Sequence, residues 1–256
     1  MIKLWAHECQ RVFQDRLISI EDREKFQGLL SQVTKEKFKR EWSGLVKVEP
    51  LLFASFVPLV YPGGDTTKKP LTDVYCELTD RDKVRKTAED SLFDYNSSNS
   101  SKKMTLVLFA SAIEHVVKIS RIIATEFGHA LLIGVGGSGR KSLTQLAVFI
   151  NLFELFQIEI SKSYDLLAWK DNMRDNLFMG CGVEGNPTVF LLSDTQIIYE
   201  AFLEDVNNIL NNGEIPNLYG NAEAQGNLVE NMREVDKKFK DYGDNEIMAE
   251  FFVRSK

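Results

Sequence analysis

The stretch Gly134-Val-Gly-Gly-Ser-Gly-Arg-Lys-Ser142 decides the fold, because it joins an apolar run, His129–Ile133, to a helix-forming segment that begins near Leu143. A strand, a glycine-rich loop and a helix in this order predict a phosphate-binding loop. Glycines let successive backbone N–H groups face a phosphate, and the helix adds unpaired N–H groups and a positive dipole end. The predicted nucleotide-binding residues are Gly134, Val135, Gly136, Gly137, Ser138, Gly139, Arg140, Lys141 and Ser142.

Two other interpretations of this loop are weaker. The glycines could serve only a tight turn between a strand and a helix. Gly134, Gly136 and Gly139 also fit the spacing of a dinucleotide-binding motif. Such a site needs an acidic residue about 20 positions further on, at the end of a strand. Glu154 lies near that position but inside an apolar run, so phosphate binding is the favoured interpretation.

The loop departs from the Walker A pattern at its end. Arg140 occupies the position of the usual lysine, and Lys141 occupies that of the serine or threonine. A planar guanidinium does not simply replace a lysine ammonium. Ser142 is then the nearest hydroxyl that could reach Mg²⁺. The pattern therefore favours nucleotide binding over hydrolysis.

A second motif follows the apolar run Thr188–Leu192, where a strand ends in Ser193, Asp194 and Thr195. In a Walker B motif one acid orients Mg²⁺ and the next activates water. Asp194 is the single acid here, so it is our candidate for a catalytic residue or a Mg²⁺ ligand. Asp194 could also cap the next helix, and the two roles are compatible.

The composition is that of a globular protein and restricts the function classes. The 256 residues are 44% hydrophobic and carry a net charge of −6, with no basic block. This argues against nucleic acid as the main partner. We expect no membrane span, because no apolar run approaches the roughly 20 residues that a bilayer requires. Three widely spaced cysteines indicate a reduced, cytoplasmic compartment, and three scattered histidines predict no metal cluster.

The pattern along the chain changes twice. Residues 1–45 are expected to be helical, with Ser19 and Asp22 forming a cap, and residues 46–103 are expected to be a linker that includes a serine-rich soft point at 96–101. From residue 104 onward, strands alternate with helices. The predicted strands are 129–133, 156–160 and 188–192; helices are predicted over 164–177 and before a capping Gly213. The fold class is α/β, and 104–256 form its main domain.

Longer segments resemble dynein heavy chains. Leu4–Leu17 resembles the end of the third AAA+ module of that family, while Gly128–Arg140, Glu154–Tyr164 and Asn212–Leu218 resemble the fourth module. The similarity covers nearly the whole chain. Arginine at the Walker lysine position, Arg140, is similar to axonemal forms rather than cytoplasmic ones.

The resemblance implies a P-loop AAA+ fold with a three-layer parallel sheet and flanking helices. It implies ATP or ADP with Mg²⁺ at a regulatory or structural site of a ring-shaped motor that moves toward microtubule minus ends. Met104–Phe109 would lie near the adenine. The implied partners are neighbouring AAA+ modules, intermediate and light chains, and microtubules; the implied location is the cytoplasm, the cytoskeleton and the ciliary axoneme.

The resemblance also implies a truncated module. The chain ends at Lys256, before the strand that in AAA+ folds carries a polar sensor. We expect unpaired sheet edges and no cooperative thermal transition. Two alternative functions stay open at this point: a nucleotide-free interaction module, which nucleotide affinity would exclude, and an independent P-loop NTPase, which phosphoryl transfer to a second substrate would reveal.

Overall fold

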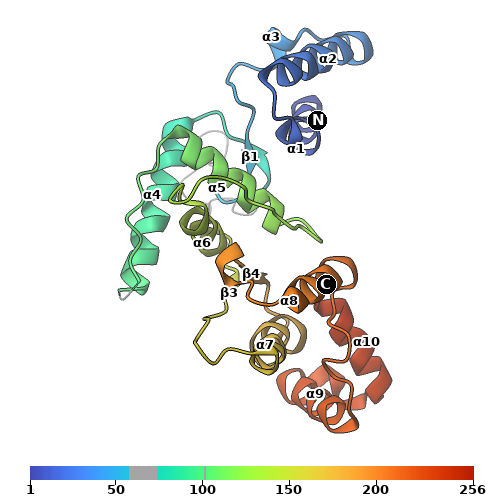
Figure 1. Cartoon of the computed structure of the whole chain (residues 1–256). Coiled ribbons are helices and arrows are strands. Elements are labelled where there is room, and N and C mark those ends of the chain that lie inside the picture. Colours follow the sequence, from blue (N-terminus) through green and yellow to red (C-terminus); the bar gives the residue numbers. More distant parts are fainter. Residues whose placement is uncertain (58–73, 101) are drawn as a thin grey trace, which may run out of the picture. The chain divides into compact units, whose positions relative to one another are not determined.

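The computed structural model describes residues 1–57, 74–100 and 102–256 (Figure 1). The chain divides into two compact units. The first contains residues 1–122 and 134–151, and the second contains residues 123–133 and 152–256. Across the described ranges, no helix combines the length and apolarity needed to cross a bilayer.

The first unit is mostly helical. Its elements are α1 (Ile2–Val12), the 3-10 helix η1 (Gln14–Arg16), α2 (Ile20–Phe38), α3 (Trp42–Leu45), β1 (Phe53–Ala54), β2 (Cys76–Glu77), α4 (Arg81–Ser98), α5 (Ala110–Ile123) and α6 (Arg140–Ile150). The strands β1 and β2 are antiparallel, with Phe53 opposite Glu77 and Ala54 opposite Cys76.

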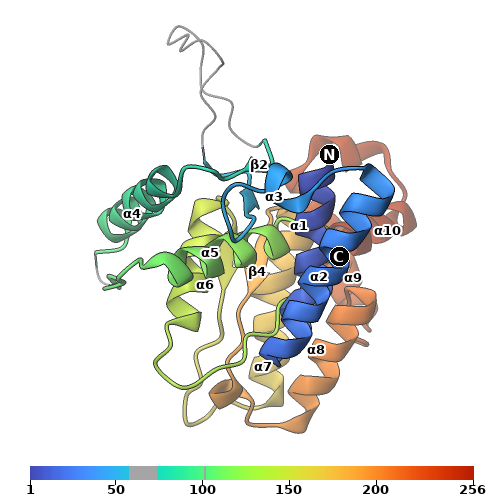
Figure 2. The same cartoon turned by 90° about the horizontal axis from the view of Figure 1, so that it is seen from above.

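The predicted helical start of the chain is confirmed as the pair α1 and α2, which lie side by side (Figure 2). The Ser19 hydroxyl caps α2 by accepting a hydrogen bond of 3.1 Å from the backbone N–H of Asp22. The two helices are joined through a small apolar core. Its buried members are Ala6, Leu30, Val46, Leu51 and Phe53.

The prediction of a soft, irregular stretch before residue 103 is wrong for α4, which is a regular helix of 18 residues. The Asp80 carboxylate caps its start by accepting from the Lys83 N–H at 3.0 Å. Val84 and Ala88 are fully buried on one face, and an apolar stripe at helical spacing is enough to stabilise a helix despite a polar sequence. The domain limits 1–45, 46–103 and 104–256 remain predictions.

The second unit contains a short parallel sheet and a helical layer. Its elements are β3 (Glu154–Phe156), α7 (Leu166–Asn172), the π-helix η2 (Met173–Glu184), β4 (Thr188–Phe190), the 3-10 helix η3 (Asp194–Gln196), α8 (Glu200–Asn212), α9 (Ala222–Val235), the 3-10 helix η4 (Lys237–Asp241) and α10 (Asp244–Arg254).

The strands β3 and β4 pair in parallel, with Leu155 opposite Val189. The predicted strand at 188–192 is confirmed over its first three residues as β4. The predicted strand at 156–160 is wrong except at Phe156, because β3 ends there. Gly213 has φ 74° and ends α8, as the sequence predicts.

The core of the second unit is aromatic. Trp169 and Phe202 stack with ring centroids 4.0 Å apart and planes inclined by 11°, and both side chains are fully buried. Phe251 of α10 packs over Gly182 of η2, where a Cβ would lie 2.3 Å from the ring. The helix predicted over 164–177 begins as α7 and continues as the wider π-helix η2 to Glu184. Both α9 and α10 pack against η2.

The prediction of a strand at 129–133 is wrong for this structure. These described residues form no β-ladder, and the side chains of Leu131 and Ile133 are each 85% exposed. A strand persists only where a neighbour supplies its ladder, and the described strands pair only as β1 with β2 and β3 with β4. The described residues thus contain two small sheets and no three-layer parallel sheet.

Candidate nucleotide-binding site

The glycine-rich loop leads directly into α6, as the sequence predicts. Gly137 and Gly139 both have φ +77°, a left-handed conformation that glycine adopts without steric cost. Gly139 is the N-cap of α6 and supplies no capping side chain, and its carbonyl accepts from the Leu143 N–H at 2.8 Å. The first turn of α6 therefore has backbone N–H groups that no N-cap side chain accepts.

The space around the loop is open. A Cβ at Gly136 or Gly137 would meet no heavy atom within 4 Å. Val135 and Ser138 are also exposed, so residues 135–138 line an accessible surface. The loop can thus accept a group of the size of a phosphate chain without rearranging a packed core.

The two cationic side chains of the loop, Arg140 and Lys141, differ in their contacts. The guanidinium of Arg140 turns back along the loop, where Nη2 donates to the Val135 carbonyl at 3.2 Å. Lys141 is exposed and Ser142 is half-buried. Leu143 and the two following turns of α6 are buried, which fixes the direction of the helix under the loop. Arg140 therefore lies along the face that a phosphate chain would contact.

One side of the loop is bordered by residues 104–109. Met104 and Leu108 are buried, whereas Val107 is 81% exposed and Phe109 is 62% exposed. The Leu106 side chain lies beside the loop, 3.9 Å from the position of a Cβ at Gly139. Leu106 thus lies beside the start of α6, and exposed apolar side chains follow it along the chain.

Asp194 lies in the second unit, in the first turn of η3. Its carboxylate is exposed and accepts from the Thr195 N–H at 3.0 Å. Gln196 anchors this turn: its side chain accepts from the Ser193 N–H at 2.8 Å and donates to the Ile158 carbonyl at 2.6 Å. The predicted phosphate residues 134–142 are contiguous in the first unit, and the roles of Ser142 and Asp194 toward Mg²⁺ and in catalysis stay predictions.

Sequence reasoning missed the contribution of Asn96. Its side-chain amide makes two hydrogen bonds to the backbone of Met104, at 2.7 and 2.9 Å. In the sequence Asn96 opens a run of serine and asparagine, which is typical of a solvated linker. A signal was nevertheless available, because Val84, Ala88 and Tyr95 recur at helical spacing and place residue 96 inside a helix.

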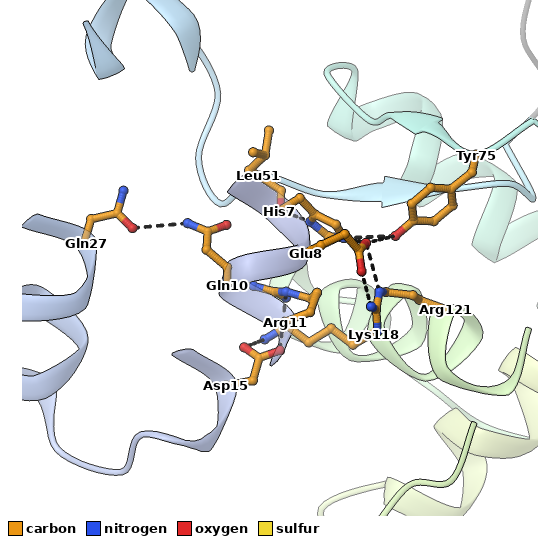
Figure 3. Close-up of polar contacts among 10 residues, drawn as sticks. All are labelled: His7, Glu8, Gln10, Arg11, Asp15, Gln27, Leu51, Tyr75, Lys118 and Arg121. Atoms are coloured by element: carbon orange, nitrogen blue, oxygen red, sulfur yellow. Dashed lines mark hydrogen bonds and ion pairs between the residues drawn. The ribbon is translucent and has the colours of Figure 1, made fainter. Parts of the chain in front are cut away.

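A polar cluster of His7, Glu8, Tyr75 and Arg121 joins α1 to α5 and to the residue just before β2 (Figure 3). The imidazole of His7 is 1% exposed, with Nδ1 2.9 Å from the Leu51 carbonyl and Nε2 3.0 Å from the Tyr75 hydroxyl. The Glu8 carboxylate accepts from Nε of Arg121 at 3.1 Å and from the Tyr75 hydroxyl at 3.3 Å. The cluster fixes α5 against the start of the chain.

Burial sets the titration of this cluster. Desolvation lowers the pKa of His7 to about 4, so the ring is neutral at physiological pH. Burial alone would raise the pKa of the Glu8 carboxyl, but the hydrogen bond and charge of Arg121 hold it below its ordinary value. Burial also raises the pKa of the Tyr75 phenol. The cluster is thus one ion pair with two neutral partners.

Comparison with known proteins identifies a family. Residues 104–256 match the model of a family described as P-loop containing dynein motor region D4. Dynein axonemal heavy chain 1 of Rattus norvegicus is 41% identical over 233 residues, which is 91% of this chain and 5% of the relative. The dynein beta chain of the flagellar outer arm of Chlamydomonas reinhardtii is 42% identical over 233 residues, or 90% of this chain and 5% of the relative.

Dynein axonemal heavy chain 6 of Homo sapiens is 41% identical over 231 residues, which is 88% of this chain and 5% of that protein. The chain therefore spans about one twentieth of the length of these curated relatives. The match to the family model begins at Met104, the residue held by Asn96, and includes the whole glycine-rich loop.

Proposed function

Because the chain belongs to the family of P-loop-containing dynein motor regions D4, we propose that it contributes a nucleotide-binding module to an axonemal dynein heavy chain. In this proposal the module binds ATP or ADP and acts as a regulatory or structural site of a minus-end-directed microtubule motor. The observation that carries the proposal is the uncapped start of α6 beneath the left-handed glycines Gly137 and Gly139.

The residues of the loop fit a phosphate chain. Backbone N–H groups of residues 135–142 would bind the phosphate oxygens, and the dipole of α6 would favour their negative charge. Arg140 would add a charge-assisted contact, because its guanidinium already lies along the loop. The exposed apolar side chains of Val107 and Phe109 would face the base. Mg²⁺, when bound, would neutralise phosphate charge, with Ser142 as its candidate protein ligand in the first unit.

Binding without efficient turnover is the expected chemistry. Arg140 stands where hydrolytic sites carry lysine, and Asp194 is the single acid after β4. Hydrolysis needs one group for the metal and another to orient the attacking water. With one of these missing, the bound nucleotide would persist and hold the module in one conformation. This matches a regulatory role better than a role as the main motor site.

The setting of the module is part of the proposal. A three-layer parallel sheet with flanking helices would form where further strands pair with β3 and β4. Adjacent AAA+ modules would form the ring, and intermediate chains, light chains and microtubules would be partners of the whole motor. The relatives' names place them in axonemes and flagella, which supports a ciliary location for this chain as well.

The direct test is ligand-induced stabilisation of the purified chain, measured with Mg-ATP and Mg-ADP. Saturation at ~100 times the dissociation constant should stabilise the folded chain by roughly 2.7 kcal/mol. Gly137→Asp should abolish the effect, because it places a carboxylate in the phosphate path. Gly137→Asn is the matched control, since asparagine tolerates a positive φ and carries no charge.

The outcomes separate the candidate functions. Stabilisation that survives Gly137→Asn and is lost in Gly137→Asp supports the proposal. Stabilisation equal in all three proteins would place the nucleotide elsewhere. No stabilisation of a folded wild-type chain would favour the alternative, a nucleotide-free structural module.

A further inference from the structure

Asn96 holds the run that borders the glycine-rich loop. Its Oδ1 accepts from the Met104 N–H at 2.7 Å and its Nδ2 donates to the Met104 carbonyl at 2.9 Å. Both polar groups of one backbone residue are thus satisfied by one side chain, in the manner of a short β-bridge. Because Asn96 belongs to α4, the position of α4 determines the position of the segment that begins at Met104.

α4 is itself braced on the loop helix. It packs against α6, and the ring of Tyr95 meets the ring of Phe149 edge-on at a centroid distance of 5.4 Å. Two consecutive residues of α4 therefore have different tasks. Tyr95 fixes the helix to α6, and Asn96 fixes Met104 to the helix.

The third link leads from Met104 back to the loop. Two residues after Met104, the Leu106 side chain lies 3.9 Å from a Cβ position at Gly139, and the Leu143 side chain lies 4.0 Å from the same position. The path from α6 through α4 and residues 104–106 thus returns to the first turn of α6. The exposed side chains of Val107 and Phe109 follow immediately along the chain, so their positions depend on this closed path.

The bonds of Asn96 are not needed to end α4. That task belongs to Asn99, whose backbone N–H and side-chain Nδ2 both reach the Tyr95 carbonyl, at 2.9 and 3.1 Å. The Asn96 side chain instead bonds to the backbone of Met104, outside α4 and eight positions further along the chain. The two asparagines can therefore be compared by mutation: Asn99 ends α4, whereas Asn96 holds the segment that leads to the loop.

We propose that Asn96 is a positioning residue that sets the base-binding side of the nucleotide site, separately from its phosphate side. The inference rests on the proposed function and makes it more specific: α4 decides whether a purine base gains binding energy beyond that of its phosphates. The ligand class is a nucleoside di- or triphosphate rather than any polyphosphate anion.

The experiment compares three probes, Mg-ADP, Mg-ATP and magnesium tripolyphosphate, on the wild-type chain, Asn96→Ala and Asn99→Ala. Losing the two backbone contacts should weaken ADP and ATP by about tenfold in Asn96→Ala, because the base loses a fixed surface. Tripolyphosphate, which has no base, should bind as tightly as to wild type. Asn99→Ala should leave the affinity for all three probes unchanged.

A second variant covers a failure of Asn96→Ala to fold. Leu106→Ala removes the contact between the run and the loop and should reproduce the selective loss of ADP and ATP. Gly137→Asp provides the phosphate reference and should lose all three probes together. The ratio of ADP to tripolyphosphate affinity is the decisive readout, because general damage to the fold would lower both.

The other possible results would overturn the positioning role of Asn96, the base-binding side or the proposed function. Equal losses for ADP and tripolyphosphate, or no loss, in Asn96→Ala would overturn the positioning role and leave the nucleotide site standing. Wild-type binding of tripolyphosphate with no preference for ADP would show that no base-binding side exists. A wild-type chain that binds none of the probes would overturn the proposed function, and this inference with it.

Discussion

The Glu8 carboxylate accepts hydrogen bonds from both Nε and Nη2 of Arg121, a residue 113 positions further along the chain. The pair joins α1 to α5, and the same carboxylate also accepts the Tyr75 hydroxyl. A carboxylate that receives a forked guanidinium and a phenol is held in one geometry. The start of the chain is thereby fixed to α5, the helix that follows residues 104–109.

The ion pair between Glu8 and Arg121 should contribute a favourable coupling free energy to the stability of the fold. A double-mutant cycle with Glu8→Gln and Arg121→Gln should give a coupling free energy of about 1–2 kcal/mol in urea unfolding. The exposed pair of Asp22 and Lys25, 3.8 Å apart, is the control and should couple by less than about 0.5 kcal/mol. Equal couplings for the two pairs would mean that the Glu8 pair is an ordinary surface contact.

His7 should make the first unit less stable in acid. Its pKa falls from 6.5 to about 4 on folding, so its stabilising contribution is complete above pH 6.5 and is lost as the pH falls toward 4. The contribution is on the order of 3 kcal/mol. Urea unfolding between pH 7 and 4.5 should show a smaller loss of stability in His7→Gln than in wild type. His115→Gln, at an exposed histidine, should behave as wild type.

Gly182 should tolerate no side chain. A Cβ there would lie 2.3 Å from the Phe251 ring and 2.8 Å from the Ser255 hydroxyl. Gly182→Ala should therefore destabilise the second unit by about 1–3 kcal/mol, measured by urea unfolding with Trp169 fluorescence. Gly226→Ala is the matched control, because that helical position is open and should gain about 0.5–1 kcal/mol. A neutral Gly182→Ala would show that α10 can move aside.

Asp205 should stabilise the core through Trp169. The carboxylate is 7% exposed and accepts from the indole Nε1 at 2.7 Å and from Lys170 Nζ at 2.8 Å. Asp205→Ala leaves a buried indole N–H without its acceptor and should cost about 1–3 kcal/mol. Asp205→Asn keeps an acceptor for the indole and should cost less, by the same unfolding measurement. The reverse order would mean that charge matters more than the indole bond.

Restoring lysine at position 140 should not restore hydrolysis. Arg140→Lys recreates the usual loop cation, but Asp194 remains the single acid after β4. Phosphate release from ATP should therefore stay at background in wild type and in Arg140→Lys. Turnover in Arg140→Lys that disappears when Gly137→Asp is added would show that the arginine alone blocks hydrolysis.

The sequence predicts best those features that depend on neighbouring residues. Gly139 at the start of α6, Ser19 at the start of α2 and Gly213 at the end of α8 all lie where local backbone chemistry requires them. Each of these positions follows from one residue's conformational preference or hydrogen bond. Recognition of the glycine-rich loop needs no knowledge of the rest of the fold.

Features that depend on distant partners are less predictable. The run 129–133 has the composition of a buried strand, but composition does not supply the neighbour that a ladder needs. The sequence did not predict α4, because its many serine and asparagine residues are typical of a linker and only Val84 and Ala88 are buried. The contact of Asn96 with Met104 depends on how α4 packs on α6, which no local pattern reports.

The π-helix η2 makes the second unit sensitive to chain length in an unusual way. In an α-helix each residue turns the chain by about 100°, while a π-helical turn needs more residues to close. Deleting one residue between Met173 and Glu184 would not simply shorten the segment, because rewinding it as an α-helix would swing Gly182 out from beneath Phe251. A change of length in this segment would rotate the residues after it about the helix axis. Homologous modules that keep the packing of Phe251 over Gly182 should therefore vary there by substitution and not by insertion or deletion.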